Sequence, residues 1–154
     1  MLKKYYLAYG SNLNLEQMAL RCPDAIPIGT INLKDYRLIY KGITDEHAYL
    51  TIEKCEGYTV PLGVYKVSYL DILSIDSYEG YPTFYSKYYF NIKLDNQNIK
   101  ALIYIMNESF NYHLPTKKYI STCTEGYKDF GFDKKILKRA LIDTKDKMVK
   151  KLKR

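Results

Sequence analysis

Two short segments of the chain carry residue types that could bind and convert a small substrate. The first, Tyr9-Gly10-Ser11-Asn12-Leu13, follows an apolar run and leads into a helical pattern. A strand, a glycine turn and a helix start gather unpaired backbone N–H groups and the positive end of a helix dipole, which suit a carboxylate, a phosphate or a developing oxyanion. The second segment holds Glu79, followed by Gly80 and Pro82, at the expected boundary between a helix and a strand. A single acid at such a boundary can be a catalytic base.

Each segment also has an ordinary structural interpretation. Glu79 could be a surface acid at a helix C-terminus, where a negative charge costs about 0.3–1 kcal/mol. The loop could be a plain turn in which Asn12 or Asn14 caps the next helix, a role that is compatible with substrate binding. Because an acid is mildly unfavourable at a helix C-terminus, its presence there slightly favours a functional role for Glu79.

Length and composition indicate an ordinary globular protein. The chain has 154 residues, of which 47% are hydrophobic and 27% charged. This length suits one domain whose core needs neither disulfides nor metal. No apolar stretch approaches the roughly 20 residues of a membrane helix, and no apolar leader with a cleavage site follows Met1. We therefore expect a soluble, cytoplasmic protein that does not bind membranes.

The cysteines do not suggest a metal site. Cys22, Cys55 and Cys123 are far apart, form no Cys-x-x-Cys pair and have only His47 and His113 as possible companions. We expect reduced thiols and no metal, with Cys22 and Cys123 packed on helix faces rather than acting as nucleophiles. The two histidines fall in expected loops and receive no role.

The net charge of +7 is concentrated at the end of the chain. Residues 145–154 hold six basic residues against Asp146, a local charge of +5, which leaves +2 for residues 1–144. We therefore expect a domain over residues 1–144 and a basic tail or frayed helix end over 145–154. Because the net charge of residues 1–144 is close to zero, we expect this domain to have no nucleic-acid partner. The rival reading, binding through the tail, predicts an affinity that falls steeply with salt.

The first quarter of the chain predicts a strand, a helix and one or two further strands. Residues 5–8 form the first strand. Asn14 caps the helix, Gln17 completes a capping box and Pro23 marks the helix end. Residues 25–41 alternate as strands do.

The middle of the chain predicts a hairpin and a buried helix. Alternation over residues 48–52 and 60–67 indicates two strands joined by a turn at Glu56-Gly57. Ser68 can then cap a helix that ends at Glu79-Gly80. We expect this helix to be largely buried, because its apolar residues surround most of its circumference.

The last third predicts an antiparallel strand pair followed by helices. Residues 88–94 and 99–106 should pair, since a polar turn separates them. Helices are expected over 115–125 and from Asp133 to 144, with a loop over 126–132. The order of elements indicates an α+β fold: a small, mixed, mostly antiparallel β-barrel with flanking helices.

Three blocks of residues resemble the γ-glutamylcyclotransferase-like family, which includes AIG2-like and γ-glutamylamine cyclotransferase-like proteins. The resemblance covers nearly the whole chain and favours a bacterial-type member. The loop from Tyr9 to Leu13 is similar to the family's substrate-binding loop. The segment Ile75-Asp76 to Glu79-Gly80, with Tyr85 six residues beyond Glu79, is similar to the family's catalytic glutamate segment. The third block, similar to the family's late helix and the loop after it, consists of Pro115, Tyr119, Gly126 and Phe130-Gly131-Phe132.

The resemblance implies a barrel with flanking helices and an enzyme that needs no cofactor. The implied partner is a small γ-glutamyl compound, and the reaction uses no water. The substrate's own α-amine attacks its γ-carbonyl, closes the five-membered lactam 5-oxoproline and releases the amine that had been attached.

The resemblance also implies roles for individual residues. Glu79 would be the general base and then the general acid, provided that its surroundings bring its pKa toward neutrality. The side chains expected to bury it are Tyr78, Tyr81, Phe84 and Tyr85.

The substrate would be held by the early loop and by tyrosines. Backbone N–H groups around Gly10 and Ser11 would meet either the developing oxyanion or the substrate's α-carboxylate, and the residues alone leave that choice open. The side chains expected to hydrogen-bond the glutamyl portion are Tyr9, Asn12, Tyr85 and Tyr119, with Tyr104 as a weaker candidate.

Two points remain open at the level of sequence. Some family members have a longer, glycine-bearing spacer where this chain has six residues with Pro82 between Glu79 and Tyr85, which affects the pocket for the leaving group. A non-catalytic member could keep the pocket to bind a small metabolite or a partner, although the presence of Glu79 argues against this. The sequence does not predict the oligomeric state.

Overall fold

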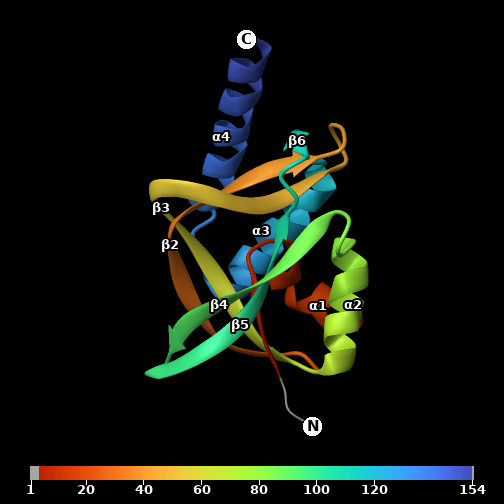
Figure 1. The fold of residues 1–154 in the computed structure, drawn as a ribbon, viewed down its shortest axis with the longest axis vertical. Helices are drawn as coiled ribbons and strands as arrows, with labels where there is room; N and C mark the ends of the chain where they lie inside the picture. The colour runs from red at the N-terminus through yellow and green to blue at the C-terminus, as the bar shows by residue number, and fades with distance from the viewer. Residues whose placement is uncertain (1–3, 154) are drawn as a thin grey trace.

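A curled six-stranded sheet with four α-helices around it makes up residues 4–153, which the computed structural model describes (Figure 1). The elements in chain order are β1 (Lys4–Ala8), the 3-10 helix η1 (Ser11–Leu13), α1 (Leu15–Arg21), β2 (Ile26–Gly42), β3 (Ala48–Val67), α2 (Tyr69–Glu79), β4 (Tyr85–Leu94), β5 (Gln97–Met106), β6 (Asn111–Tyr112), α3 (Lys117–Phe130) and α4 (Lys135–Leu152).

The sheet is mixed but mostly antiparallel, as the sequence predicts. Its strand order is β4-β5-β1-β3-β2-β6. The short strand β1 lies at the centre, antiparallel to β3 and parallel to β5. Tyr6 in the middle of β1 is thereby opposite Tyr65 on one side and Leu102 on the other. The chain leaves β1 from the centre of the sheet, and this position places the following loop against the core.

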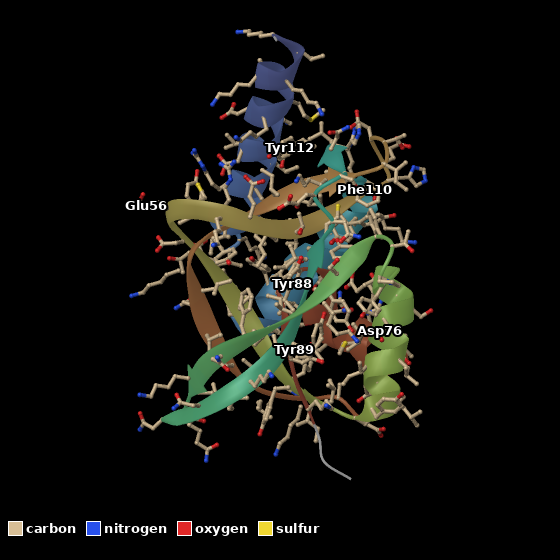
Figure 2. All side chains as sticks on the ribbon, viewed as in Figure 1. Glu56, Asp76, Tyr88, Tyr89, Phe110 and Tyr112 are labelled. Carbon is tan, nitrogen blue, oxygen red and sulfur yellow. The ribbon has the colours of Figure 1, made fainter. Side chains whose placement is uncertain are left out.

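The predicted hairpin at Glu56-Gly57 is wrong, because β3 runs without interruption from Ala48 to Val67 and pairs with β2 along its length. Gly57 has φ +86° and donates its N–H to Oδ1 of Asp35, which itself has φ +64° beside a register shift in β2. These two residues bend both strands together instead of reversing the chain. Figure 2 shows Glu56 at this corner of β3.

The bend brings the two ends of the sheet toward one another. The rings of Tyr36 in β2 and Phe90 in β4 lie 6.1 Å apart, and a Cβ at Gly29 would lie 3.0 Å from Leu94 of β4. Side chains of strands β2 and β4, which are not neighbours in the sheet, therefore meet across the curl. The sheet is a half-barrel, and the predicted α+β class with flanking helices is confirmed.

Helix α2 is less buried than expected. Its buried residues are Asp71, Ile72 and Ile75, whereas Leu70 and Leu73 are exposed. Its start is as predicted, because Ser68 and Asp71 exchange the two bonds of a capping box. One face of α2 packs against the body, and Figure 1 shows the helix along one side of the molecule.

The two last helices are longer than predicted. Helix α3 continues to Phe130, so the first part of the expected 126–132 loop is helical. Gly126 lets this part of α3 lie directly against the start of α1, because a Cβ there would lie 2.7 Å from backbone atoms of Leu13 and Asn14. Helix α4 continues through the basic segment to Leu152 and projects beyond the strands (Figure 1).

No helix within residues 4–153 combines the length and the apolar character that crossing a membrane requires. Across the same residues, no three His, Cys, Asp or Glu side chains come together as the ligands of a metal ion would.

Candidate functional site

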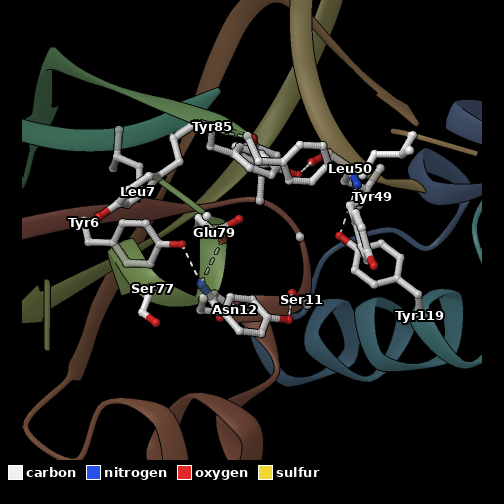
Figure 3. A pocket seen from close by; sticks show the side chains of 17 residues that line it. Tyr6, Leu7, Ser11, Asn12, Tyr49, Leu50, Ser77, Glu79, Tyr85 and Tyr119 are labelled. Atoms are coloured by element: carbon white, nitrogen blue, oxygen red, sulfur yellow. Dashed lines mark hydrogen bonds between the residues drawn. The ribbon is translucent and has the colours of Figure 1, made fainter. Parts of the chain in front are cut away.

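A pocket of about 370 Å³ opens where the loop after β1 meets the end of α2. Strands β1, β3, β4 and β5 and helix α3 supply its other walls. Most of the residues predicted to form the site line it together (Figure 3). They are Tyr9, Gly10, Ser11, Asn12, Glu79, Tyr85, Tyr104 and Tyr119.

Leu13 does not reach this pocket. It is fully buried, and its side chain faces Gly63, at which a Cβ would lie 2.6 Å from Leu13 Cδ2. Leu13 therefore anchors the loop in the core, while the residues before it line the pocket. Its predicted part in substrate binding is not supported by this position.

Glu79 is the last residue of α2, and Gly80 follows in the left-handed conformation with φ +66°. This C-cap ends the helix and leaves Glu79 directed into the pocket, partly buried (Figure 3). Burial raises the pKa of its carboxyl from 4.5 to about 7, and the positive charge of Arg21 acts in the opposite direction. At neutral pH such a group can both take and give a proton.

Asn12 connects Glu79 to the loop. Its Nδ2 donates to Oε1 of Glu79 over 3.4 Å and to the hydroxyl of Tyr6 over 2.9 Å. Its Oδ1 accepts from the guanidinium of Arg21, and its backbone carbonyl accepts from the Tyr65 hydroxyl over 2.7 Å. Each hydrogen-bonding group of this buried side chain is thus bound to protein.

The loop itself differs from the predicted direct entry into a helix. The 3-10 helix Ser11–Leu13 comes first, and α1 begins only at Leu15, with Asn14 accepting from the N–H of Gln17 as the predicted cap. The predicted capping box is not completed, because the N–H of Asn14 binds the carbonyl of Ser11 and the side chain of Gln17 accepts from Arg21. Within η1 the N–H groups of Leu13 and Asn14 bind the carbonyls of Gly10 and Ser11. The N–H groups of Ser11 and Asn12 precede this pattern and take no part in it.

Tyr85 and Tyr119 meet at one residue of β3. The hydroxyl of Tyr85 donates to the Leu50 carbonyl over 2.7 Å, and the hydroxyl of Tyr119 accepts from the Leu50 N–H over 3.1 Å. Burial raises the pKa of both hydroxyls well above the usual value, so both remain protonated. These tyrosines fix β3 beside the loop, whatever else they bind.

Tyr9 and Tyr104 form a second linked pair. The Tyr9 hydroxyl donates to the Tyr104 backbone carbonyl over 2.5 Å, and the Tyr104 hydroxyl donates to Asp76 of α2. Asp76 also holds Lys87 of β4 in an ion pair of 2.8 Å. The turn of α2 that ends at Glu79 is therefore tied to β5 and β4.

Several residues at the site carry no signal in the sequence. Tyr6, Tyr49 and Leu50 line the pocket from strands, where sequence alternation does not reveal which face meets a cavity. Arg21 stacks over the Tyr78 ring at 3.5 Å, beside the pocket. Tyr78 lies at the pocket as expected, but Tyr81, which we expected to bury Glu79, does not line it.

The cysteines occupy structural positions. Cys22 and Cys123 are fully buried, and burial raises the pKa of each thiol to about 12. Thiols with so high a pKa are poor nucleophiles at neutral pH. The prediction that these two residues serve packing is consistent with this environment.

Comparisons with known proteins identify the family and the fold of this chain. The family model described as "Gamma-glutamyl cyclotransferase, AIG2-like" matches residues 6–124. A search of curated proteins finds no match.

Solved structures share the fold. One named "Gamma-glutamyl cyclotransferase" is 26% identical, with a TM-score of 0.75 over 90% of this chain and 86% of the other. A structure of an uncharacterized human protein has the same identity, TM-score and coverage. YkqA from Bacillus subtilis is similar in fold alone, at 15% identity and a TM-score of 0.73 over 94% of this chain and 55% of its own. Because the family model spans most of the chain and includes both the loop after β1 and Glu79, the chain belongs to the gamma-glutamyl cyclotransferase, AIG2-like family.

Proposed function

We propose that this protein is a γ-glutamylcyclotransferase that converts the γ-glutamyl group of a small amide into 5-oxoproline, with Glu79 as the group that moves the proton. The family and the fold support cyclotransferase-like activity. The observation that carries the finer proposal is Glu79, the one carboxyl among the described residues that line the pocket, whose pKa, about 7, matches the pH at which it must act.

The proposed reaction is an intramolecular transfer. The α-ammonium group of the substrate loses one proton to solvent, and ionised Glu79 takes a second proton from the same nitrogen as that nitrogen attacks the γ-carbonyl carbon. A new C–N bond closes the lactam, the original amide C–N bond breaks, and protonated Glu79 returns its proton to the departing nitrogen. No water is consumed, and Glu79 ends in the state in which it began.

In this scheme, much of the rate acceleration comes from holding the substrate's amine close to its γ-carbonyl. A nucleophile and an electrophile in the same molecule can reach effective concentrations of roughly 10⁵–10⁸ M when they are held in a reactive geometry. The N–H groups at the start of η1 are suited to the oxyanion that forms on the γ-carbonyl or to the substrate's α-carboxylate. The hydroxyls of Tyr9, Tyr85 and Tyr119 surround the same space.

The test is release of 5-oxoproline from γ-glutamyl amides, measured by mass spectrometry for the wild type and for Glu79→Gln. Loss of a general acid–base group should lower kcat by about 10²–10⁴-fold. Glu56→Gln is the matched control, because Glu56 is exposed at the corner of β3 (Figure 2) and does not line the pocket. Equal activity of wild type and Glu79→Gln would remove Glu79 from the mechanism. No product from any protein would favour a non-catalytic binding role.

A further inference from the structure

The pocket has two chemically different parts on either side of Glu79. Figure 3 shows Tyr6 to one side of the carboxylate and Tyr49 and Tyr119 to the other. The first part contains the Tyr6 hydroxyl and the Asn12 amide, which are hydrogen-bonded to each other. The second part is apolar and aromatic, and it is made by Ile43, Tyr49, Leu50, Phe84 and Tyr119.

The rings of the second part are arranged as walls. The Tyr49 ring stands perpendicular to Phe84, with centroids 5.9 Å apart, and perpendicular to Tyr119, with centroids 5.2 Å apart. A planar ring placed here would meet an edge or a face on more than one side, which is the preferred geometry of aromatic contacts. Ile43, whose side chain is 67% exposed, stands at the rim.

The lining carries almost no charge. Among residues 4–153, those that line the pocket include one carboxylate, Glu79, and no lysine, arginine or histidine. Arg21 lies outside the lining and is bound to Asn12 and stacked on Tyr78. A charged group brought into an apolar part without a partner of opposite sign pays its desolvation in full.

We infer that the amine released by this enzyme is uncharged apart from its amino group and carries an aromatic ring, which lies against Tyr49 and Phe84. This inference rests on the proposed function and specifies the half of the substrate that does not react. The glutamyl half takes the polar part beside Tyr6 and Asn12, because its charged α-ammonium and α-carboxylate groups would lose their hydration without compensation against the aromatic rings. The leaving group then occupies the aromatic part, where a carboxylate on it would find no cation.

The test compares substrates that differ by one group. The probes are γ-glutamyl-phenethylamine, γ-glutamyl-phenylalanine, which adds only a carboxylate, and γ-glutamyl-methylamine, which lacks the ring. We expect kcat/KM for the phenethylamine to exceed that of each other substrate by at least about tenfold. Equal or faster turnover of γ-glutamyl-phenylalanine or γ-glutamyl-methylamine would overturn the inference while leaving the proposed function intact. A fourth probe is ε-(γ-glutamyl)-lysine. Product from none of the four probes would overturn both the inference and the proposed function.

A variant with an added cation at the rim gives an independent test. Ile43→Arg should raise the ratio of kcat/KM for γ-glutamyl-phenylalanine over γ-glutamyl-phenethylamine by several-fold, because it supplies the missing partner for the carboxylate. Ile43 is exposed, so the fold should tolerate the change. Ile142→Arg is the matched control, because it adds the same charge at an exposed position of α4. An unchanged ratio in Ile43→Arg, or an equal rise in Ile142→Arg, would contradict the placement of the leaving group.

Discussion

Asn12 and Glu79 are 67 residues apart in the chain, and the amide of Asn12 donates a hydrogen bond to the Glu79 carboxyl over 3.4 Å. The orientation of this amide is set by its other bonds, because its oxygen accepts from Arg21 and its nitrogen also serves Tyr6. The amide nitrogen therefore faces Glu79. With its hydrogen-bonding groups bound to protein, Asn12 is suited to position and stabilise the ionised Glu79 rather than to contact the substrate.

The first prediction concerns this bond. Asn12→Ala removes a donor that favours the charged carboxyl and should raise the pKa of Glu79 by up to about one unit, since a hydrogen bond to a charged group is worth roughly 1.5–3 kcal/mol and this one is long. The rising, acid-side limb of the profile of kcat against pH should move to higher pH. The measurement is the pH–rate profile from pH 5 to pH 9.

Asn98→Ala, at an exposed position in β5, controls for the loss of an asparagine. If Asn12 instead contacts the substrate, Asn12→Ala will raise KM and leave the acid-side limb in place. That outcome would contradict the positioning role and restore the reading of Asn12 as a substrate ligand.

The second prediction is that Glu79 costs the protein stability above neutral pH. Its pKa is about 7 in the folded protein and near 4.5 when the chain is unfolded. Between these values the folded state holds more protons than the unfolded state, so the free energy of unfolding falls as pH rises, and the full cost, at most about 3 kcal/mol, is present above pH 7. Glu79→Gln cannot ionise and should be more stable than wild type at pH 8, with the difference shrinking toward pH 4.5.

Urea unfolding of both proteins between pH 4 and pH 8 measures this difference. Glu56→Gln should run parallel to the wild type, because Glu56 is exposed. A constant difference between wild type and Glu79→Gln across the pH range would show that burial does not perturb Glu79. The proposed proton transfer near neutral pH would then lose its physical basis.

Local signals in the sequence located the parts of the fold that local chemistry decides. Ser68 caps α2 as expected, and Asn14 caps α1 through the N–H of Gln17. The same signals misled at Gly57, where a turn-type sequence bends a long strand, because pairing with β2 over many residues outweighs the local preference. Contacts distant in sequence decided that outcome.

The residues of the site also divide into those that a local sequence motif reveals and those that only the folded sheet reveals. The loop after β1 and Glu79 are carried by compact motifs, and both line the pocket. Tyr6 and Leu50 lie on strands β1 and β3, and the face of the sheet that meets the pocket depends on how the whole sheet curls. No pattern in one sequence encodes that curl.

The third prediction concerns the tie between α2 and β5. Tyr104→Phe removes the hydroxyl that donates to Asp76, one turn before Glu79, and leaves Asp76 with only Lys87 from this cluster. Because Asp76 is partly exposed, the loss should be about 1–2 kcal/mol of the free energy of unfolding. A looser α2 terminus should lower kcat several-fold, since Glu79 would be held less firmly.

Urea unfolding and 5-oxoproline release check the two effects. Tyr88→Phe is the matched control, because Tyr88 is an exposed residue of the neighbouring strand β4 (Figure 2). Should Tyr104→Phe match the control in both measurements, the cluster of Asp76, Lys87 and Tyr104 would have no part in placing Glu79.

The fourth prediction reverses the usual effect of alanine in a helix. Replacing a glycine inside a helix by alanine normally stabilises it by about 1 kcal/mol. At Gly126 in α3 the new Cβ would lie 2.7 Å from the backbone of Leu13 and Asn14, so either α3 or the loop must move. Overpacking of this kind costs roughly 1–3 kcal/mol, and Gly126→Ala should therefore be less stable than wild type by about 1–2 kcal/mol net.

The activity of this variant tests whether the contact also positions the site. Leu13 and Asn14 directly follow the loop that lines the pocket, so a displaced loop should lower kcat/KM for 5-oxoproline release by more than the unfolded fraction explains. Ser121→Ala, at an exposed position of the same helix, should leave stability and activity at the wild-type level. Wild-type stability in Gly126→Ala would mean that α3 does not approach the loop this closely. Lower stability with unchanged activity per folded molecule would mean that the close contact holds the fold together without setting the geometry of the pocket.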